Sequence, residues 1–160
     1  MQYLSKSEVE RWLRTEIDSV DGTLQRLNMY PIPHDAGRKM ALAKGLIGYW
    51  LDWSGGGLLF IKEYGIWPTS EYMPLFDGYR RALGENRSID EAPGYLIAEE
   101  MLEPAIAFLA MALYFMWDVI LVSVADRLTI ELTHDEELFA AGYDPQKLSR
   151  LQARITQYCA

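Results

Sequence analysis

The chain has 160 residues, half of them hydrophobic and 24% charged, a composition typical of one folded domain that argues against disorder. Fifteen lysines and arginines stand against 23 aspartates and glutamates, so the formal net charge is −8, which disfavours nucleic acid as a partner. Cys159 is the single cysteine, which excludes an internal disulfide framework and a thiolate metal cluster and predicts a cytoplasmic protein. Residues 1–10 lack the features of a signal peptide.

Two helices are expected in the first third of the chain. Ser7 and Glu10 match the capping-box pattern, and apolar residues at helical spacing follow, so the first helix is predicted over about 8–20. Asp35 is a suitable cap for a second helix over about 36–53. The apolar surface of this helix includes an aromatic cluster, Tyr49, Trp50 and Trp53.

A buried strand and a third helix are expected next. Glycines at 55–57 follow a helix and precede a strand, the reverse of a phosphate-binding loop, so they predict a helix end. Residues 58–61 are apolar and predict a buried strand that continues to Tyr64. Pro74 suits the first turn of a third helix that Gly84 ends.

The second half of the chain contains the strongest fold signal. Residues 104–117 are apolar on every side, as expected of a helix that is buried all round. Residues 119–124 resemble a strand and residues 128–133 alternate apolar with polar side chains, so they predict a hairpin. Asp118 interrupts this apolar stretch, and an acid near the bilayer centre costs about 3 kcal/mol, so no membrane-spanning helix is expected.

Two more helices are expected after the hairpin. Thr133 and Glu136 match a second capping box, which predicts a short helix that ends at Gly142. Asp144 and Pro145 supply the cap and the first-turn proline of the last helix.

These elements predict a single α+β domain over residues 1–160. The domain is expected to contain a small, mostly antiparallel sheet of about four strands, one of them at 95–98. Five or six helices are expected to pack on this sheet, and one of them (104–117) is predicted to be fully buried.

No catalytic, cofactor-binding or metal-binding residue is predicted. His134 precedes three acids, but consecutive residues point in different directions, whereas metal ligands on a helix are three or four residues apart. A helix start accounts for these residues, because acids stabilise the first helical turn. Asp118 is expected to hydrogen-bond the corner between helix and strand, and neither histidine lies in a motif with a nucleophile.

Residues 67–81 are expected to form the partner-binding surface, because aromatic and charged side chains are concentrated there. Tryptophan and tyrosine are enriched at binding hot spots, since one end of each is apolar and the other can hydrogen-bond. The predicted partner-binding residues are Trp67, Glu71, Tyr72 and Asp77.

Three alternatives stay open at this point. Trp67 and its neighbours could complete the core instead of facing a partner. An enzyme or small-ligand receptor would have its pocket near Trp67, Glu71, Arg80 and Arg81. A structural homodimer would be held by the tryptophan-rich helix 36–53.

Four short segments, 63–71, 92–94, 115–118 and 133–136, contain tryptophan-proline-serine-glutamate, glycine and tryptophan-aspartate landmarks. In these landmarks the chain resembles a group of uncharacterised bacterial single-domain proteins, over about residues 57–140. The resemblance implies a bacterial source and one integral domain. The group has no established activity, so the resemblance implies no site residue.

The first interpretation is therefore a small acidic protein-binding module. Its most concrete form is an immunity or antitoxin-type inhibitor of a basic toxin domain, because opposite charge speeds the encounter of such partners. This interpretation depends on the size of the chain, its surplus of acid and the aromatic segment 67–81. Nucleic acid, membrane and cofactor are not expected as partners.

Overall fold

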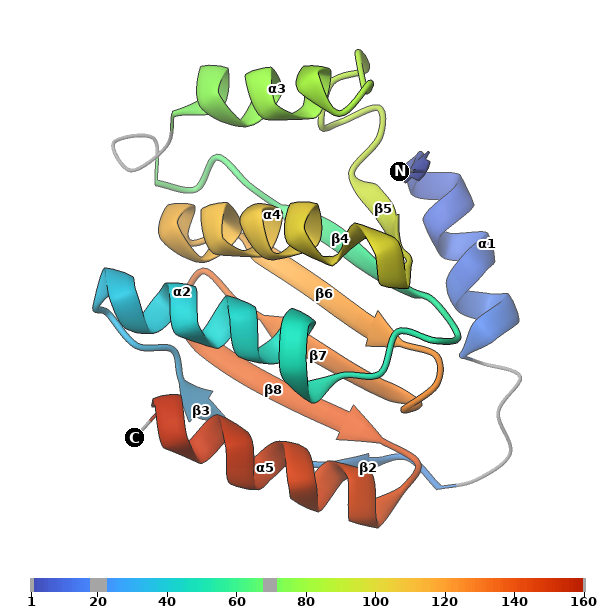
Figure 1. The fold of residues 1–160 in the computed structure, drawn as a ribbon, viewed down its shortest axis with the longest axis vertical. Coiled ribbons are helices and arrows are strands. Elements are labelled where there is room, and N and C mark those ends of the chain that lie inside the picture. The colour runs from blue at the N-terminus through green and yellow to red at the C-terminus, as the bar shows by residue number, and fades with distance from the viewer. Residues whose placement is uncertain (1, 18–22, 68–71, 160) are drawn as a thin grey trace.

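The computed structural model describes residues 2–17, 23–67 and 72–159. Within these ranges, eight strands form one open antiparallel sheet in the order β1, β5, β4, β6, β7, β8, β2, and β3 also pairs with β8 (Figure 1). The strands are β1 (Gln2–Leu4), β2 (Gln25–Arg26), β3 (Tyr30–Pro31), β4 (Gly57–Glu63), β5 (Gly94–Ile97), β6 (Asp118–Ser123), β7 (Leu128–Leu132) and β8 (Glu137–Gly142).

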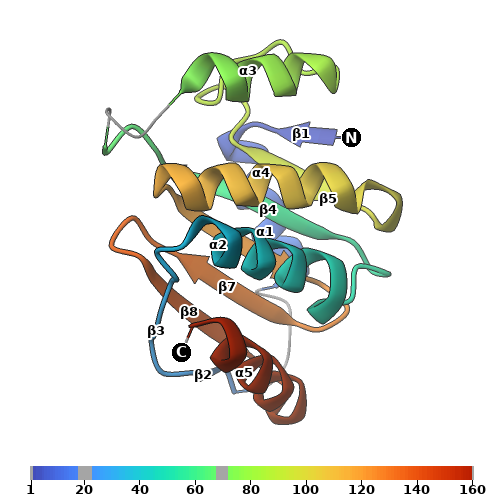
Figure 2. The same ribbon diagram turned by 60° about the vertical axis from the view of Figure 1, so that its left-hand side comes forward.

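Five α-helices accompany the sheet in the described part of the chain. They are α1 (Lys6–Glu16), α2 (Ala36–Lys44), α3 (Met73–Ala82), α4 (Leu102–Phe115) and α5 (Pro145–Cys159). The end of α2 runs on into a π-helical turn, Gly45–Trp50, and the turn Glu99–Met101 precedes α4. Helices α2, α4 and α5 cover one face of the sheet, α3 lies beside α4, and α1 lies on the opposite face (Figures 1 and 2).

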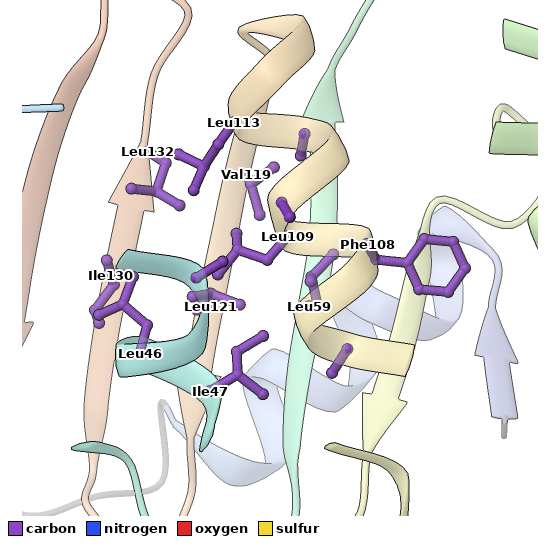
Figure 3. Close-up of a cluster of buried hydrophobic side chains, with 14 of the residues drawn as sticks. Leu46, Ile47, Leu59, Phe108, Leu109, Leu113, Val119, Leu121, Ile130 and Leu132 are labelled. Carbon is purple, nitrogen blue, oxygen red and sulfur yellow. The ribbon is translucent and has the colours of Figure 1, made fainter. Parts of the chain in front are cut away.

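The main core lies between the sheet and α2 with α4. Alternate strand residues such as Leu59, Leu121 and Ile130 point to this side and are fully buried. Figure 3 shows them packed against Leu46 and Leu109 from the helical layer. On the other face, a smaller cluster forms where Val9 of α1 meets Leu58 and Val122.

The α+β class and the antiparallel sheet are confirmed, but the expected number of about four strands is wrong. Strands β1, β2 and β3 have only two or three residues each, too few to show an alternating pattern. The predicted helix after Thr133 is strand β8, in which every second residue is buried against the helical layer. Residues 133–136 form the hairpin turn instead, and Glu136 adopts a left-handed φ of 59°.

Helix α4 is not fully buried, contrary to the prediction. Most of its side chains lie in the core, but Tyr114 is 44% exposed, Glu103 is exposed, and Ala107 and Met111 are half-buried. These four residues are spaced three or four apart, so they form one outward stripe. A uniformly apolar helix gives no signal in its own sequence of which side faces outward.

The first helix begins two residues earlier than predicted, because Ser5 and not Ser7 is its cap. The Ser5 side chain accepts a hydrogen bond from the Glu8 backbone N–H at 3.4 Å, and Glu8 accepts the Ser5 backbone N–H at 2.7 Å. Ser5 with Glu8 and Ser7 with Glu10 both fit the capping-box pattern, so the sequence alone does not show which serine is the cap.

The long apolar stretch is divided between α4 and β6. In the described ranges, no helix combines the length and the apolar character that crossing a membrane requires.

Candidate functional site

Two of the predicted partner-binding residues lie on the surface. Trp67 is 47% exposed and Tyr72, the residue before α3, is 63% exposed, so neither completes the core. Asp77 is half-buried on α3. Glu71 lies outside the described residues.

An apolar groove of about 500 Å³ lies between α3 and α4, with one residue of α2 at its edge. Its lining residues are Met40, Leu75, Tyr79, Ala107, Ala110, Met111, Tyr114 and Phe115. The outward stripe of α4 forms one wall of this groove, and Leu75, which is 55% exposed, stands on the other. Glu103 is the charged end of the stripe. Burial raises the pKa of Tyr79, and the negative charge of Glu103 raises it further by a smaller amount. We call this surface the α3–α4 groove.

Arg80 and Arg81, two residues of the alternative pocket, lie in different surroundings. Arg80 is buried, and its Nη2 donates to the carbonyl oxygens of Arg87, Ser88 and Ala92 at 3.3, 3.2 and 2.9 Å. Burial lowers the pKa of Arg80. Arg81, by contrast, is exposed. The role of Arg80 is to hold the loop between α3 and β5.

In the tryptophan-rich segment, both tryptophans pack against other parts of the same chain. Trp53 is buried, and its indole N–H donates to the carbonyl of Ile47 at 2.6 Å. The ring of Trp50 packs on Tyr158 with centroids 5.1 Å apart. Only Tyr49 of this cluster projects outward, with 81% of its surface exposed.

A second candidate site is formed by three side chains from different elements. Glu63 at the end of β4, Asp118 at the start of β6 and His134 in the β7–β8 turn place their ligand atoms within 4.8 Å of one another. Glu63 reaches this position through a β-bulge: Ile61 pairs with Val119 and Glu63 with Asp118, so one residue is extra. Because the bulge reverses the alternation, Glu63 lies beside Asp118 instead of following Ile61 into the core.

Asp118 and His134 are joined by two hydrogen bonds. The Asp118 Oδ1 atom accepts the backbone N–H of His134 at 2.7 Å and lies 2.8 Å from Nδ1 of its imidazole. The hydrogen bond to the Asp118 carboxylate raises the pKa of His134. We call Glu63, Asp118 and His134 the acid–histidine cluster.

A neighbouring network occupies the other side of the same turn. Buried Lys39 donates to Glu136 at 2.7 Å and to the carbonyl of Leu113 at 3.1 Å, and exposed His34 lies 2.6 Å from Glu136. Burial acts to raise the pKa of Glu136, but the hydrogen bonds and charges of Lys39 and His34 together outweigh it and hold the pKa below its usual value. This network ties α2 and α4 to the hairpin turn.

The sequence alone did not predict that the residues of the α3–α4 groove, or those of the acid–histidine cluster, lie next to one another. Asp118 and His134 each stand out in the sequence, and Glu63 is an acid beside a buried segment, but the three meet only through strand pairing and a bulge, which leave no spacing pattern. No family model, curated protein or solved structure matches this chain.

Proposed function

We propose that this protein is a protein-binding module whose α3–α4 groove receives an apolar, helical segment of a basic partner. The observation that carries the proposal is the groove itself: a channel of about 500 Å³ lined by apolar side chains of three helices. An amphipathic helix laid into a groove is a common recognition mode for such surfaces.

The charge of the chain supports a basic partner. The formal net charge is −8, and three exposed acids, Glu99, Glu100 and Glu103, lie at the N-terminal end of α4. Glu103 belongs to the same stripe as the groove residues Ala107, Met111 and Tyr114. Attraction between opposite charges would raise the association rate and favour one orientation of the bound segment.

The narrower form of the proposal is an immunity or antitoxin-type inhibitor of a basic toxin domain. It is supported by the small size and the acidity of the chain, together with exposed Trp67 and Tyr72 near the start of α3. In a complex with such a partner, truncation of a central apolar anchor typically costs about 2 kcal/mol or more.

The test is a titration of the isotope-labelled protein with a synthetic peptide of leucine and lysine at helical spacing, followed by methyl NMR. We expect saturable shifts at Met40, Leu75 and Met111 and weak or no binding of the matching leucine–glutamate peptide. Tyr114→Glu should weaken binding about tenfold or more, because it places a charge in the apolar wall. Tyr49→Glu, at an exposed aromatic outside the groove, is the matched control.

Shifts that appear elsewhere, or that survive Tyr114→Glu, would contradict the proposal. A toxin domain encoded by an adjacent gene would supply the natural partner for the same titration. With that partner, Leu75→Ala should chiefly accelerate dissociation.

A further inference from the structure

We propose that the acid–histidine cluster, Glu63, Asp118 and His134, binds one divalent first-row transition-metal ion of the Zn²⁺ or Mn²⁺ class. The site is separate from the α3–α4 groove, and the inference does not depend on the proposed function. Three elements distant in sequence place two carboxylates and one imidazole within 4.8 Å of one another. Each of these groups is a common ligand of such ions.

The distances suit a shared ion. Metal bonds to oxygen and nitrogen are about 2.1 Å long, so neighbouring ligand atoms in an octahedral shell are roughly 3 Å apart. Nδ1 of His134 and Oδ1 of Asp118 lie 2.8 Å apart in a hydrogen bond, and a bound ion would replace the proton between them. The ligand atom of Glu63 lies within 4.8 Å of both, and its side chain is exposed and so has room to rotate.

The charges around the cluster favour a cation. Asp118 is buried, and in the described residues its only ion-pair partner is His134. Lys62 is the cation beside it on β4, but its Nζ bonds to Glu131 at 2.8 Å. Asp135 adds a further carboxylate 3.8 Å from Nε2 of His134. A divalent ion would offset this surplus of negative charge.

The donor set selects the class of ion. Ca²⁺ and Mg²⁺ prefer shells made of oxygen alone, whereas an imidazole with carboxylates suits Zn²⁺, Mn²⁺ and their neighbours. Three protein ligands leave coordination positions open, as in metal sites that hold water or substrate rather than in closed structural sites. Glu63 and His134 are both accessible to solvent, so an ion can enter.

The test is isothermal titration of the full chain with ZnCl₂ and MnCl₂, using protein without a histidine tag that has been stripped with EDTA. We expect one ion per chain. Glu63→Gln and His134→Ala should each weaken binding about tenfold or more, because each removes a ligand. Asp118→Asn would remove the third ligand, but Asp118 is buried and this variant could fail to fold. Glu63 is exposed, so Glu63→Gln tests the site without that risk.

Two variants serve as matched controls. Glu10→Gln removes an exposed acid of α1 that is not part of the cluster, and His34→Ala removes the other histidine of the chain. Both should bind the ion as tightly as the wild type, and Zn²⁺ should shift the imidazole NMR signals of His134 but not those of His34. Absence of saturable binding at millimolar metal would overturn the proposal. Loss of binding in His34→Ala but not in His134→Ala would overturn it too, because the ion would then sit at His34 and Glu136.

Discussion

Buried charges in this protein are held by several partners at once, as the loop after α3 illustrates. The Arg80 guanidinium lies 5.1 Å from the ring centroid of Tyr3 and donates to three carbonyl groups of that loop. Glu85, also buried, accepts hydrogen bonds from the backbone and the side chain of Arg87. Arg87 in turn donates to the carbonyl of Tyr3 at 3.2 Å. These contacts therefore hold the loop against β1. The hydrogen bonds among the charged groups compensate for the water that each group loses on burial.

The pair of Glu85 and Arg87 should make stability depend on pH. The hydrogen bond from Arg87 lowers the pKa of Glu85 below its usual value of 4.5, so the stabilisation is present above that pH and is lost as pH falls through the folded-state pKa. We expect Glu85→Gln to reduce the free energy of unfolding by about 1–2 kcal/mol at pH 7. The difference from the wild type should shrink between about pH 5 and pH 3. Urea unfolding at several pH values measures it.

Glu10→Gln, at an exposed acid of α1, is the control and should change the free energy of unfolding by less than about 0.5 kcal/mol. A Glu85→Gln deficit that is the same at every pH would show that packing, and not charge, explains the effect.

At the scale of elements, the contact of α1 with the sheet depends on one glycine. A Cβ atom at Gly94 of β5 would lie 2.3 Å from Cγ2 of Val9, which is fully buried. Gly94 also pairs with Leu4 on one side and Phe60 on the other, so the strand cannot move away without disturbing the ladder. The absence of a side chain lets the helix approach the strand closely.

Gly94→Ala should therefore destabilise the protein by about 1–3 kcal/mol, because the added methyl group overpacks the contact with Val9. Gly78→Ala is the matched control: a Cβ at Gly78 in α3 meets no atom within 4 Å, and alanine is the better helix former. We expect the control to be neutral or to stabilise by up to about 1 kcal/mol. Equal losses in both variants, measured by thermal unfolding, would contradict this account.

At the scale of the whole molecule, one continuous core joins α2, α3, α4 and α5 to the sheet. Trp53 and Trp117 are buried in it, and Trp117 packs on Phe76 of α3 with ring centroids 4.8 Å apart. A core shared by all these elements predicts that they unfold together.

Unfolding in urea should accordingly show one transition, with the same midpoint by tryptophan fluorescence and by far-UV circular dichroism. Fluorescence sums over the five tryptophans of the chain, of which Trp53 and Trp117 are buried in this core, whereas circular dichroism reports the helices and strands. Separate midpoints would show that part of the chain unfolds independently, and they would contradict the prediction of a single domain.

Local patterns were enough to predict the elements with long runs or strong caps. The apolar stretch 104–117, the hairpin of β6 and β7, and the start of α5 at Pro145 all follow from residues that are close in sequence. Such signals work because a helix cap or an alternating strand involves neighbours within a few residues. The α+β class follows from these elements.

The sites depended on the tertiary structure. Thr133 and Glu136 fit a helix cap, but pairing of β8 with β7 buries Leu138 and Ala140 and turns the segment into a hairpin. The apolar character of α4 can be read from its own residues, whereas the outward position of Tyr114 depends on how the helix packs against α2 and the sheet. Likewise, the sequence supplies Glu63, Asp118 and His134, but only antiparallel pairing and a bulge bring them together. The physical reason is the same in each case: burial and strand pairing join residues far apart along the chain, and local spacing does not record such contacts.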